Sequence, residues 1–340
     1  MQRATTRQSF AVMLIVLMLS APFTAQKKEK NNEKHKEKNV ATLPAVIWRD
    51  PGDVASLNLL YGIGGKEHAP DPNGTYTFVS EDLEKTSPKF DIKDEQGVKW
   101  RVKLGQEPQS ETAATRLLWA AGYFVDEDYY LASFKVTGLP KLHRGGEFVS
   151  PDGTVRDARL ERKPKEVGKL GNWDWFKNPF LGQREFNGLR VMMALVNNWD
   201  LKNVNNTIRV IDGEPRYTVT DAGATFGNTG NSLTRSKSRP KDYVDSKFIA
   251  KVNSDSVDFE LHSRPFFLSV VNVPNYKERT KMEQVTKHIP RADAKWLGER
   301  LGQLSEEQIN DCFRSAGYSP DEITILTQTV RKRIAELNAL

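Results

Sequence analysis

Apolar residues change their spacing about halfway along the chain, and this change limits the folds that the sequence can adopt. In the first half they alternate with polar residues in short runs that end at Gly, Pro or Asn, which is typical of β-strands. In the second half they recur every three or four residues, which is typical of helices packed on a core. The sequence therefore predicts an α+β fold in two lobes, a strand-rich one followed by a helical one.

The first half also contains one helix signal among its strands. Ser110 is expected to cap this helix and Gly122 to end it, with an apolar stripe between them. Strands or hairpins are expected at 75–82, 90–105, 129–136 and 146–164.

The second half contains one long helix, a tight hairpin and two helices with clear start signals. The long helix is expected to end just before Asn197, and the hairpin over 206–223 to turn at Asp212-Gly213. Capping boxes predict the two C-terminal helices and are formed by Ser305 with Gln308 and by Ser319 with Glu322.

The N-terminus has the order of features found in a secretory signal. Arg3 and Arg7 precede the apolar run Phe10–Leu19, and small residues follow up to Ala25. The run is shorter than the roughly 18 residues that a membrane-spanning helix needs. Residues 1–25 are therefore predicted to be a signal peptide and the body to be secreted or periplasmic. The protein is not expected to be an integral membrane protein unless this segment stays uncleaved.

Residues 26–42 are predicted to be a charged, disordered linker because they hold almost no apolar side chain. This linker and the two N-terminal arginines account for most of the chain's net charge of +6, which leaves +1 for residues 41–340. A nucleic-acid partner is excluded for the body, since phosphate binding needs a clustered basic face. The strand-rich lobe is predicted over 43–145 and the hairpin with the helical lobe over 146–340.

Polar residues with fixed spacing follow the long helix in the stretch NNWDLKNVNN. Asp200, Lys202 and Asn205 form the pattern D-x-K-x-x-N, and Asp221 begins a D-x-G pattern sixteen residues after the Asn. Lys103 ends a predicted strand far upstream, and Glu111 lies in the first turn of the next predicted helix.

This ordered set resembles the protein-kinase-like superfamily. Asn198-Trp199 stands where His-Arg is usual, and Ala222 follows Asp221 where Phe is usual. These departures are more similar to the atypical branches, which include HipA-like kinases, secreted Golgi-type kinases, the spore-coat kinase and phosphoinositide kinases. The resemblance spans about 55–340 in architecture, and its specific residues are confined to about 100–115 and 197–224.

The resemblance implies a role for each of these residues in the use of ATP and Mg²⁺. Phosphoryl transfer needs the donor held in line, its charge neutralised and the acceptor hydroxyl oriented. The implied roles are catalytic for Asp200 and Lys202, metal-binding for Asn205 and Asp221, and nucleotide-binding for Lys103, Glu111, Gly62 and Gly64.

Most of these residues also have a structural interpretation without function. Asp200 and Asn205 are common turn-formers, and Asp221-Ala222-Gly223 could be a plain β-turn. Lys103 could be a solvated strand lysine, and Glu111 would favour a helix N-terminus without any partner. The Gly62–Gly65 stretch could be a plain flexible turn, since it matches neither a kinase glycine loop nor Walker A.

The predicted function is that of an exported kinase that moves the γ-phosphate of ATP to a hydroxyl acceptor of unknown kind. ATP is scarce outside the bacterial cytoplasm, and this favours one alternative, a non-catalytic binding module on the same scaffold. A second alternative is a nucleotidyltransferase that uses the same residues with the nucleotide reversed.

Overall fold

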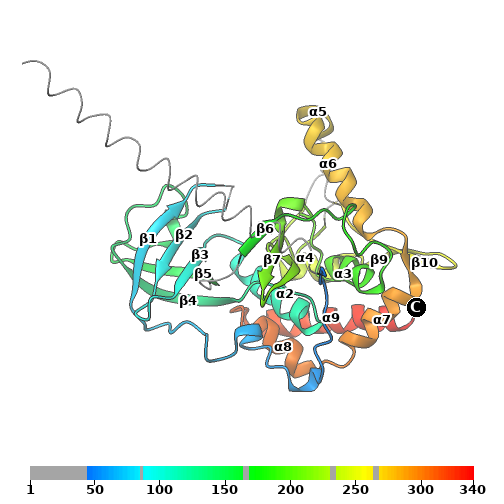
Figure 1. Ribbon diagram of the computed structural model, residues 1–340, viewed down its shortest axis with the longest axis horizontal. Coiled ribbons are helices and arrows are strands. Elements are labelled where there is room, and N and C mark those ends of the chain that lie inside the picture. The colour runs from blue at the N-terminus through cyan, green and yellow to red at the C-terminus, as the bar shows by residue number, and fades with distance from the viewer. Residues whose placement is uncertain (1–43, 85–86, 164–167, 230–234, 263–267) are drawn as a thin grey trace, which may run out of the picture.

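Buried apolar side chains form two separate cores in the computed structural model, which describes residues 44–84, 87–163, 168–229, 235–262 and 268–340. One core fills a β-barrel and the other lies among helices. Figure 1 shows the barrel at one end of the molecule and most helices at the other. The predicted two-lobed α+β fold is confirmed. The predicted signal peptide, 1–25, and linker, 26–42, lie outside the described residues.

Five strands close the barrel of the first lobe in the order β1-β2-β3-β5-β4. Neighbours are antiparallel except β1 and β4, whose parallel pairing closes the barrel. Phe90, Val102 and Leu160 pair across β2, β3 and β5 and are fully buried inside it. The strands are β1 (Tyr76–Asp82), β2 (Lys89–Lys93), β3 (Lys99–Lys103), β4 (Asp128–Thr137) and β5 (Thr154–Lys163).

The first lobe does not match the range 43–145 that the sequence predicted. The barrel extends to Lys163, because β5 is the strand that joins β3 to β4. Residues 44–60 instead pack on the second lobe, where Tyr217 donates a hydrogen bond to the carbonyl of Val46. Arg300 likewise pairs with Asp50 at 2.9 Å. The predicted boundaries failed because strand partners distant in sequence decide which lobe a segment joins.

Helix α2 (Pro108–Ala120) connects the two lobes. Its apolar residues belong to the helical core, although it follows β3 directly in the chain. The sequence predicted that the helix would begin after Ser110. It begins at Pro108 instead, because proline suits the first helical position. The hydroxyl of Ser110 donates instead to the carbonyl of Gly223 at 2.8 Å, which links α2 to the segment after Asp221.

The second lobe combines two small sheets with the remaining helices. Both capping boxes predicted at Ser305 and Ser319 are present. In Figure 1 α5 and α6 extend away from the body. The strands are β6 (Gly168–Gly171), β7 (Asn206–Ile211), β8 (Glu214–Val219), β9 (Ile249–Val252), β10 (Ser256–Phe259) and β11 (Ile289–Pro290). The helices are α3 (Arg184–Leu195), α4 (Pro240–Asp245), α5 (Leu268–Val271), α6 (Val273–Glu283), α7 (Arg291–Leu301), α8 (Glu306–Arg314) and α9 (Pro320–Asn338).

Within the described residues, no helix has both the length and the apolar content that crossing a bilayer requires.

Candidate active site

Lys103 lies at the end of β3 and is almost fully buried, with 5% of its surface exposed. Its Nζ is 2.9 Å from Oε2 of Glu111 and 3.2 Å from Oδ1 of Asp221. It is also 2.5 Å from Oε2 of Glu107, the residue that immediately precedes α2. Lys103 is therefore not a solvated strand lysine, and Glu111 is not a helix residue without a partner, because the two form a buried ion pair.

The charges of this cluster depend on one another. Burial alone would lower the pKa of Lys103, but Glu111, Asp221 and Glu107 outweigh it and raise that pKa, so the ammonium stays charged. Burial raises the pKa of Glu111 to about 7, against the opposing effect of Arg159 and Lys103. Burial would also raise the pKa of Glu107, but Lys103 and Lys237 lower it to about 2.

The loop after α3 is held by the three residues that precede Asp200. Asn197 has φ +55°, a conformation that Asn adopts more readily than most residues, and its Nδ2 donates to the carbonyl of Gly227 at 2.7 Å. The Oδ1 of Asn198 accepts from the backbone N–H of Asp200 at 3.1 Å, which forms the turn. Trp199 donates from Nε1 to the carbonyl of Ser236 at 2.8 Å.

Asp200, Lys202 and Asn205 converge at the end of this loop. Lys202 Nζ lies 2.8 Å from Oδ1 and 3.0 Å from Oδ2 of Asp200. Asn205 donates from Nδ2 to the carbonyl of Asp200 at 2.9 Å, and Arg279 approaches Oδ1 of Asp200 at 3.7 Å. The turn is formed by the side chain of Asn198, so the interpretation of Asp200 as a simple turn-former does not hold.

Asp221 reaches the site from the end of the β7–β8 hairpin, 118 residues after Lys103. Its Oδ1 contacts Lys103, and its side chain remains 30% exposed. Within the described part of the chain, Oδ2 of Asp221 accepts no hydrogen bond, so it is available to a ligand. Thr220, the preceding residue, donates its N–H to the carbonyl of Asn205 at 3.0 Å, which places Asp221 beside the Asp200 loop.

These residues line one cavity of about 600 Å³ between the two lobes. The barrel side contributes Lys103, and α2 contributes Glu111. The second lobe contributes Asp200, Lys202, Asn205 and Asp221. Six of the eight predicted site residues, distant in sequence, thus share one cavity.

Gly62 and Gly64, the other two predicted site residues, do not line this cavity. They form a 3₁₀ turn (Gly62–Gly64) that packs against α2. A side chain at Gly62 would collide with Arg116, and one at Gly64 with Tyr129 and Glu127. These glycines permit close packing against α2 and β4, and their binding of nucleotide stays a prediction.

Only some of the acidic groups in this cavity are placed to bind a hard cation such as Mg²⁺. Carboxylate oxygens of Glu107, Glu111 and Asp221 lie within 4.8 Å of one another, a spacing that could hold a metal. The Lys103 ammonium, however, contacts all three at 2.5–3.2 Å and occupies the space between them. Asp221, with its second oxygen, and Asn205 are therefore the residues that fit a metal on the cavity side.

A group of charged residues that was not predicted from the sequence lines the rest of the cavity. Arg159 on β5 lies 3.3 Å from Glu111 and 3.4 Å from Glu161. Arg209 on β7 lies 3.5 Å from Glu161 and 2.5 Å from Asp126. Burial and Glu161 raise the pKa of Asp126 to about 8, against the opposing effect of Arg209. The charged residues Arg159 and Glu161, which flank the apolar Leu160 on β5, were the signal that could have indicated this charged face.

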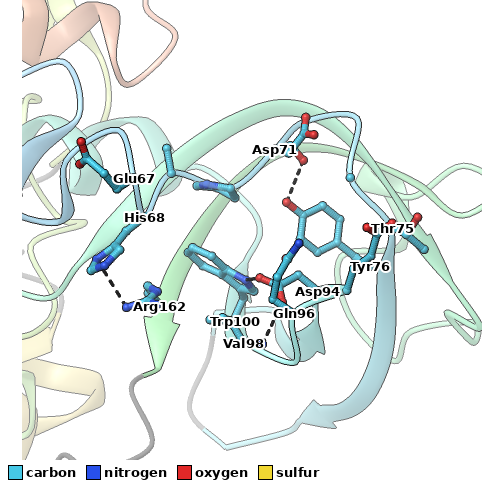
Figure 2. Close-up of a pocket in the computed structure, with 14 residues that line it drawn as sticks. Glu67, His68, Asp71, Thr75, Tyr76, Asp94, Gln96, Val98, Trp100 and Arg162 are labelled. Atoms are coloured by element: carbon cyan, nitrogen blue, oxygen red, sulfur yellow. Dashed lines mark hydrogen bonds between the residues drawn. The ribbon is translucent and has the colours of Figure 1, made fainter.

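A second cavity, of about 430 Å³, opens at the other end of β3 (Figure 2). Its polar groups bond mainly to one another: Trp100 donates to Asp94 at 2.9 Å, and Tyr76 to the carbonyl of Asp71 at 2.8 Å. His68 contacts Arg162 at 3.4 Å. None of the predicted site residues lines it, so the cavity between the lobes is the candidate active site.

The chain matches no protein-family model, and it matches no curated protein. It is similar to the solved structure of the Helicobacter pylori proinflammatory kinase CtkA, with 11% identity over 79% of this chain and 98% of that one and a TM-score of 0.43. It is also similar to the Golgi casein kinase, with 9% identity, coverage of 79% and 72%, and a TM-score of 0.34.

A further similarity is to the amicoumacin kinase hAmiN, in complex with AMP-PNP, Ca²⁺ and Ami. Identity there is 12%, coverage is 91% of this chain and 96% of that one, and the TM-score is 0.23. All three of these solved structures are of kinases.

Proposed function

We propose that this protein transfers the γ-phosphate of ATP to a hydroxyl group of an acceptor. The observation that supports this most strongly is the meeting of Lys103 and Glu111 with Asp221 in the same cavity as Asp200 and Asn205. A buried lysine held by a glutamate presents a fixed positive charge to a phosphate. The carboxylates on the opposite wall supply a proton acceptor and a metal ligand.

The proposed chemistry needs little covalent help from the protein. The acceptor oxygen forms a bond to the γ-phosphorus while the bond from that phosphorus to ADP breaks. Asp200 orients the acceptor hydroxyl and accepts its proton, and Lys202 neutralises charge on the transferring group. Lys103 holds the phosphates that remain on ADP, and Glu111 keeps Lys103 extended toward them.

Asp221 and Asn205 would hold Mg²⁺, which neutralises phosphate charge when it is bound. Both residues offer oxygen ligands, and both line the cavity. We further propose that the reaction takes place outside the cytoplasm. The basic, apolar and small-residue order of residues 1–25 supports export.

Label transfer from ATP tests this proposal directly. The purified protein is incubated with Mg²⁺, an extract as the source of acceptors, and ATP labelled at either the γ or the α position. Transfer of the γ label alone is expected. Asp221→Ala should abolish it without lowering the melting temperature, whereas Asp255→Ala, at an exposed aspartate outside the cavity, should leave it unchanged.

The same experiment separates the alternatives. Transfer of the α label would indicate nucleotidyl transfer, with AMP joined to the acceptor and pyrophosphate released. Transfer of neither label, with no stabilisation by ATP and Mg²⁺ together, would indicate a non-catalytic binding module. Full activity of Asp221→Ala would contradict the assigned site.

A further inference from the structure

The barrel wall of the cavity is charged along three neighbouring strands. Lys89, Lys103 and Arg159 pair side by side across β2, β3 and β5. Asp91, Arg101 and Glu161 form the next such row. The alternate residues of these strands face the apolar interior of the barrel. Because side chains alternate between faces along a strand, this face presents charged groups to the second lobe.

Among its described residues, the second lobe adds no enclosed apolar surface opposite this wall. Arg209 and Lys169 come from β7 and β6 and line the same cavity. Among the nineteen described residues that line it, eight are basic, six are acidic, and only Val204 has an aliphatic side chain. Val204 is itself 48% exposed, so it offers little enclosed apolar surface.

Two arginines that line the cavity, Arg159 on the barrel wall and Arg209 on the second lobe, are incompletely hydrogen-bonded. Within the described part of the chain, the Nε–H groups of Arg159 and Arg209 make no hydrogen bond. Arg159 is 4% exposed, and its Nε lies 3.3 Å from Glu111 without hydrogen-bond alignment. Phosphate oxygens are the acceptors that match arginine donors best, because guanidinium groups bind them in a planar, charge-assisted geometry.

A purine base would gain little in such a cavity. Its flat faces are stabilised by leaving water for apolar surroundings, at about 25 cal/mol per Å² of apolar surface. Here the base would lie against ion pairs such as Arg209–Glu161 and Arg101–Asp91. Phosphate groups gain charge-assisted hydrogen bonds from the same side chains.

We infer that the donor is recognised by its phosphates and not by its base, so that other nucleoside triphosphates and inorganic tripolyphosphate serve in place of ATP. This inference rests on the proposed function, because it concerns the donor of the same transfer. The acceptor oxygen bonds to the terminal phosphorus, the bond to the bridging oxygen breaks, and pyrophosphate leaves from tripolyphosphate where ADP leaves from ATP. Asp200 accepts the hydroxyl proton in each case. Such a donor also suits an exported protein, since ATP is scarce there.

Competition for the donor site tests the inference. Binding of ATP, GTP and tripolyphosphate to the full chain is measured by calorimetry with Mg²⁺, and each unlabelled compound competes with γ-labelled ATP in the transfer assay. Dissociation constants within about tenfold of one another are expected, since charge-assisted contacts dominate all three. Adenosine, which has the base and ribose without phosphate, should not compete.

Lys163→Gln is the informative variant, since Lys163 lines the cavity on β5 and its side chain remains 31% exposed. It should weaken ATP, GTP and tripolyphosphate alike by about tenfold, as expected for one lost contact to a charged group. The matched control is Lys135→Gln, at a lysine 66% exposed on β4, which should change none of them.

The outcomes separate this inference from the proposed function. If ATP binds and donates while tripolyphosphate neither competes nor donates, the inference is overturned and the proposed function stands. Competition by adenosine would overturn it in the same way. If no donor transfers phosphate, the proposed function fails and the inference fails with it.

Discussion

The two walls of the cavity are held in different ways. On the barrel side, side chains hold one another through ion pairs that run from Lys103 through Glu111 and Arg159 to Glu161, which also pairs with Arg209 of the second lobe. On the helical side, the Asp200 loop is fixed mainly to backbone carbonyls and neutral groups. Arg333, 2% exposed, donates to the carbonyl of Leu195 and to Oδ1 of Asn197, both at 2.8 Å.

This difference separates two tasks. The charge of the barrel wall depends on groups that titrate near neutral pH, so bound phosphate and pH both change it. The loop of the helical wall depends on hydrogen bonds to backbone groups, which do not titrate. We therefore expect the barrel wall to set donor affinity and the helical wall to set the position of Asp200. Substitutions that change one wall at a time separate these two tasks.

The largest effect is expected from Asp200→Asn. Losing the proton acceptor should lower kcat by about 10²–10⁴-fold, with little change in the KM for the donor. The shape of the side chain is kept, so the contacts of Lys202 and Asn205 persist in part. Steady-state transfer kinetics measure both constants. A variant with normal kcat and raised KM would remove the distinction between the walls.

Arg333→Met should loosen the loop that carries Asp200, because Arg333 supports the start of that loop. The change leaves Oδ1 of Asn197 without its donor, while the carbonyls of Leu195 and Tyr243 each lose one of the donors they accept from. We expect a loss of about 3 kcal/mol in the free energy of unfolding, because a buried acceptor is left unsatisfied and several hydrogen bonds of a buried charged group are lost. We also expect kcat to fall more than donor affinity. Urea unfolding measures the stability, and Lys332→Met, at the exposed neighbouring residue, is the control.

The barrel wall should make stability depend on pH. Burial and Glu161 raise the pKa of Asp126 from an ordinary 3.8 to about 8, so the folded chain holds this proton more tightly than the unfolded chain. The free energy of unfolding should therefore fall as pH rises between these two values. Asp126→Asn should remove about 2 kcal/mol of that fall. Urea unfolding from pH 5 to pH 8 checks this, and equal slopes for both proteins would contradict it.

The smallest effect is expected outside both walls, at Ser305→Ala. The Ser305 hydroxyl accepts from the N–H of Gln308 at 3.1 Å in the capping box of α8. Its removal should cost about 1 kcal/mol of stability and leave kcat and donor affinity unchanged. A change in either constant would mean that the site is sensitive to general loss of stability, and the comparison of the walls would need that correction.

Residues close together in the sequence were predicted well. The spacing of Asp200, Lys202 and Asn205 places them on one loop whatever surrounds it, and capping boxes are local hydrogen-bond patterns. Lys103, Glu111 and Asp221 are far apart in the sequence and were predicted only through the resemblance. They do lie together in the cavity.

Features that depend on pairing between distant segments were not predicted. The role of Arg159 follows from the register of β5 with β3, and that of Arg209 from the packing of β7 beneath the barrel. The same limit explains the mistaken boundary at 145 and the position of Gly62 and Gly64 outside the cavity lining, since a glycine pair is compatible with both a phosphate loop and close packing on a helix.

A double-mutant cycle tests most directly the claim that Lys103 and Asp221 act on one bound donor. Transfer of the γ label is measured for the wild type, for Lys103→Met, for Asp221→Asn and for the double variant. We predict that each single change lowers kcat/KM by at least about 100-fold and that the double change lowers it little further, because residues that act as a unit are not additive. Single changes without effect, or losses that simply multiply, would contradict the shared site.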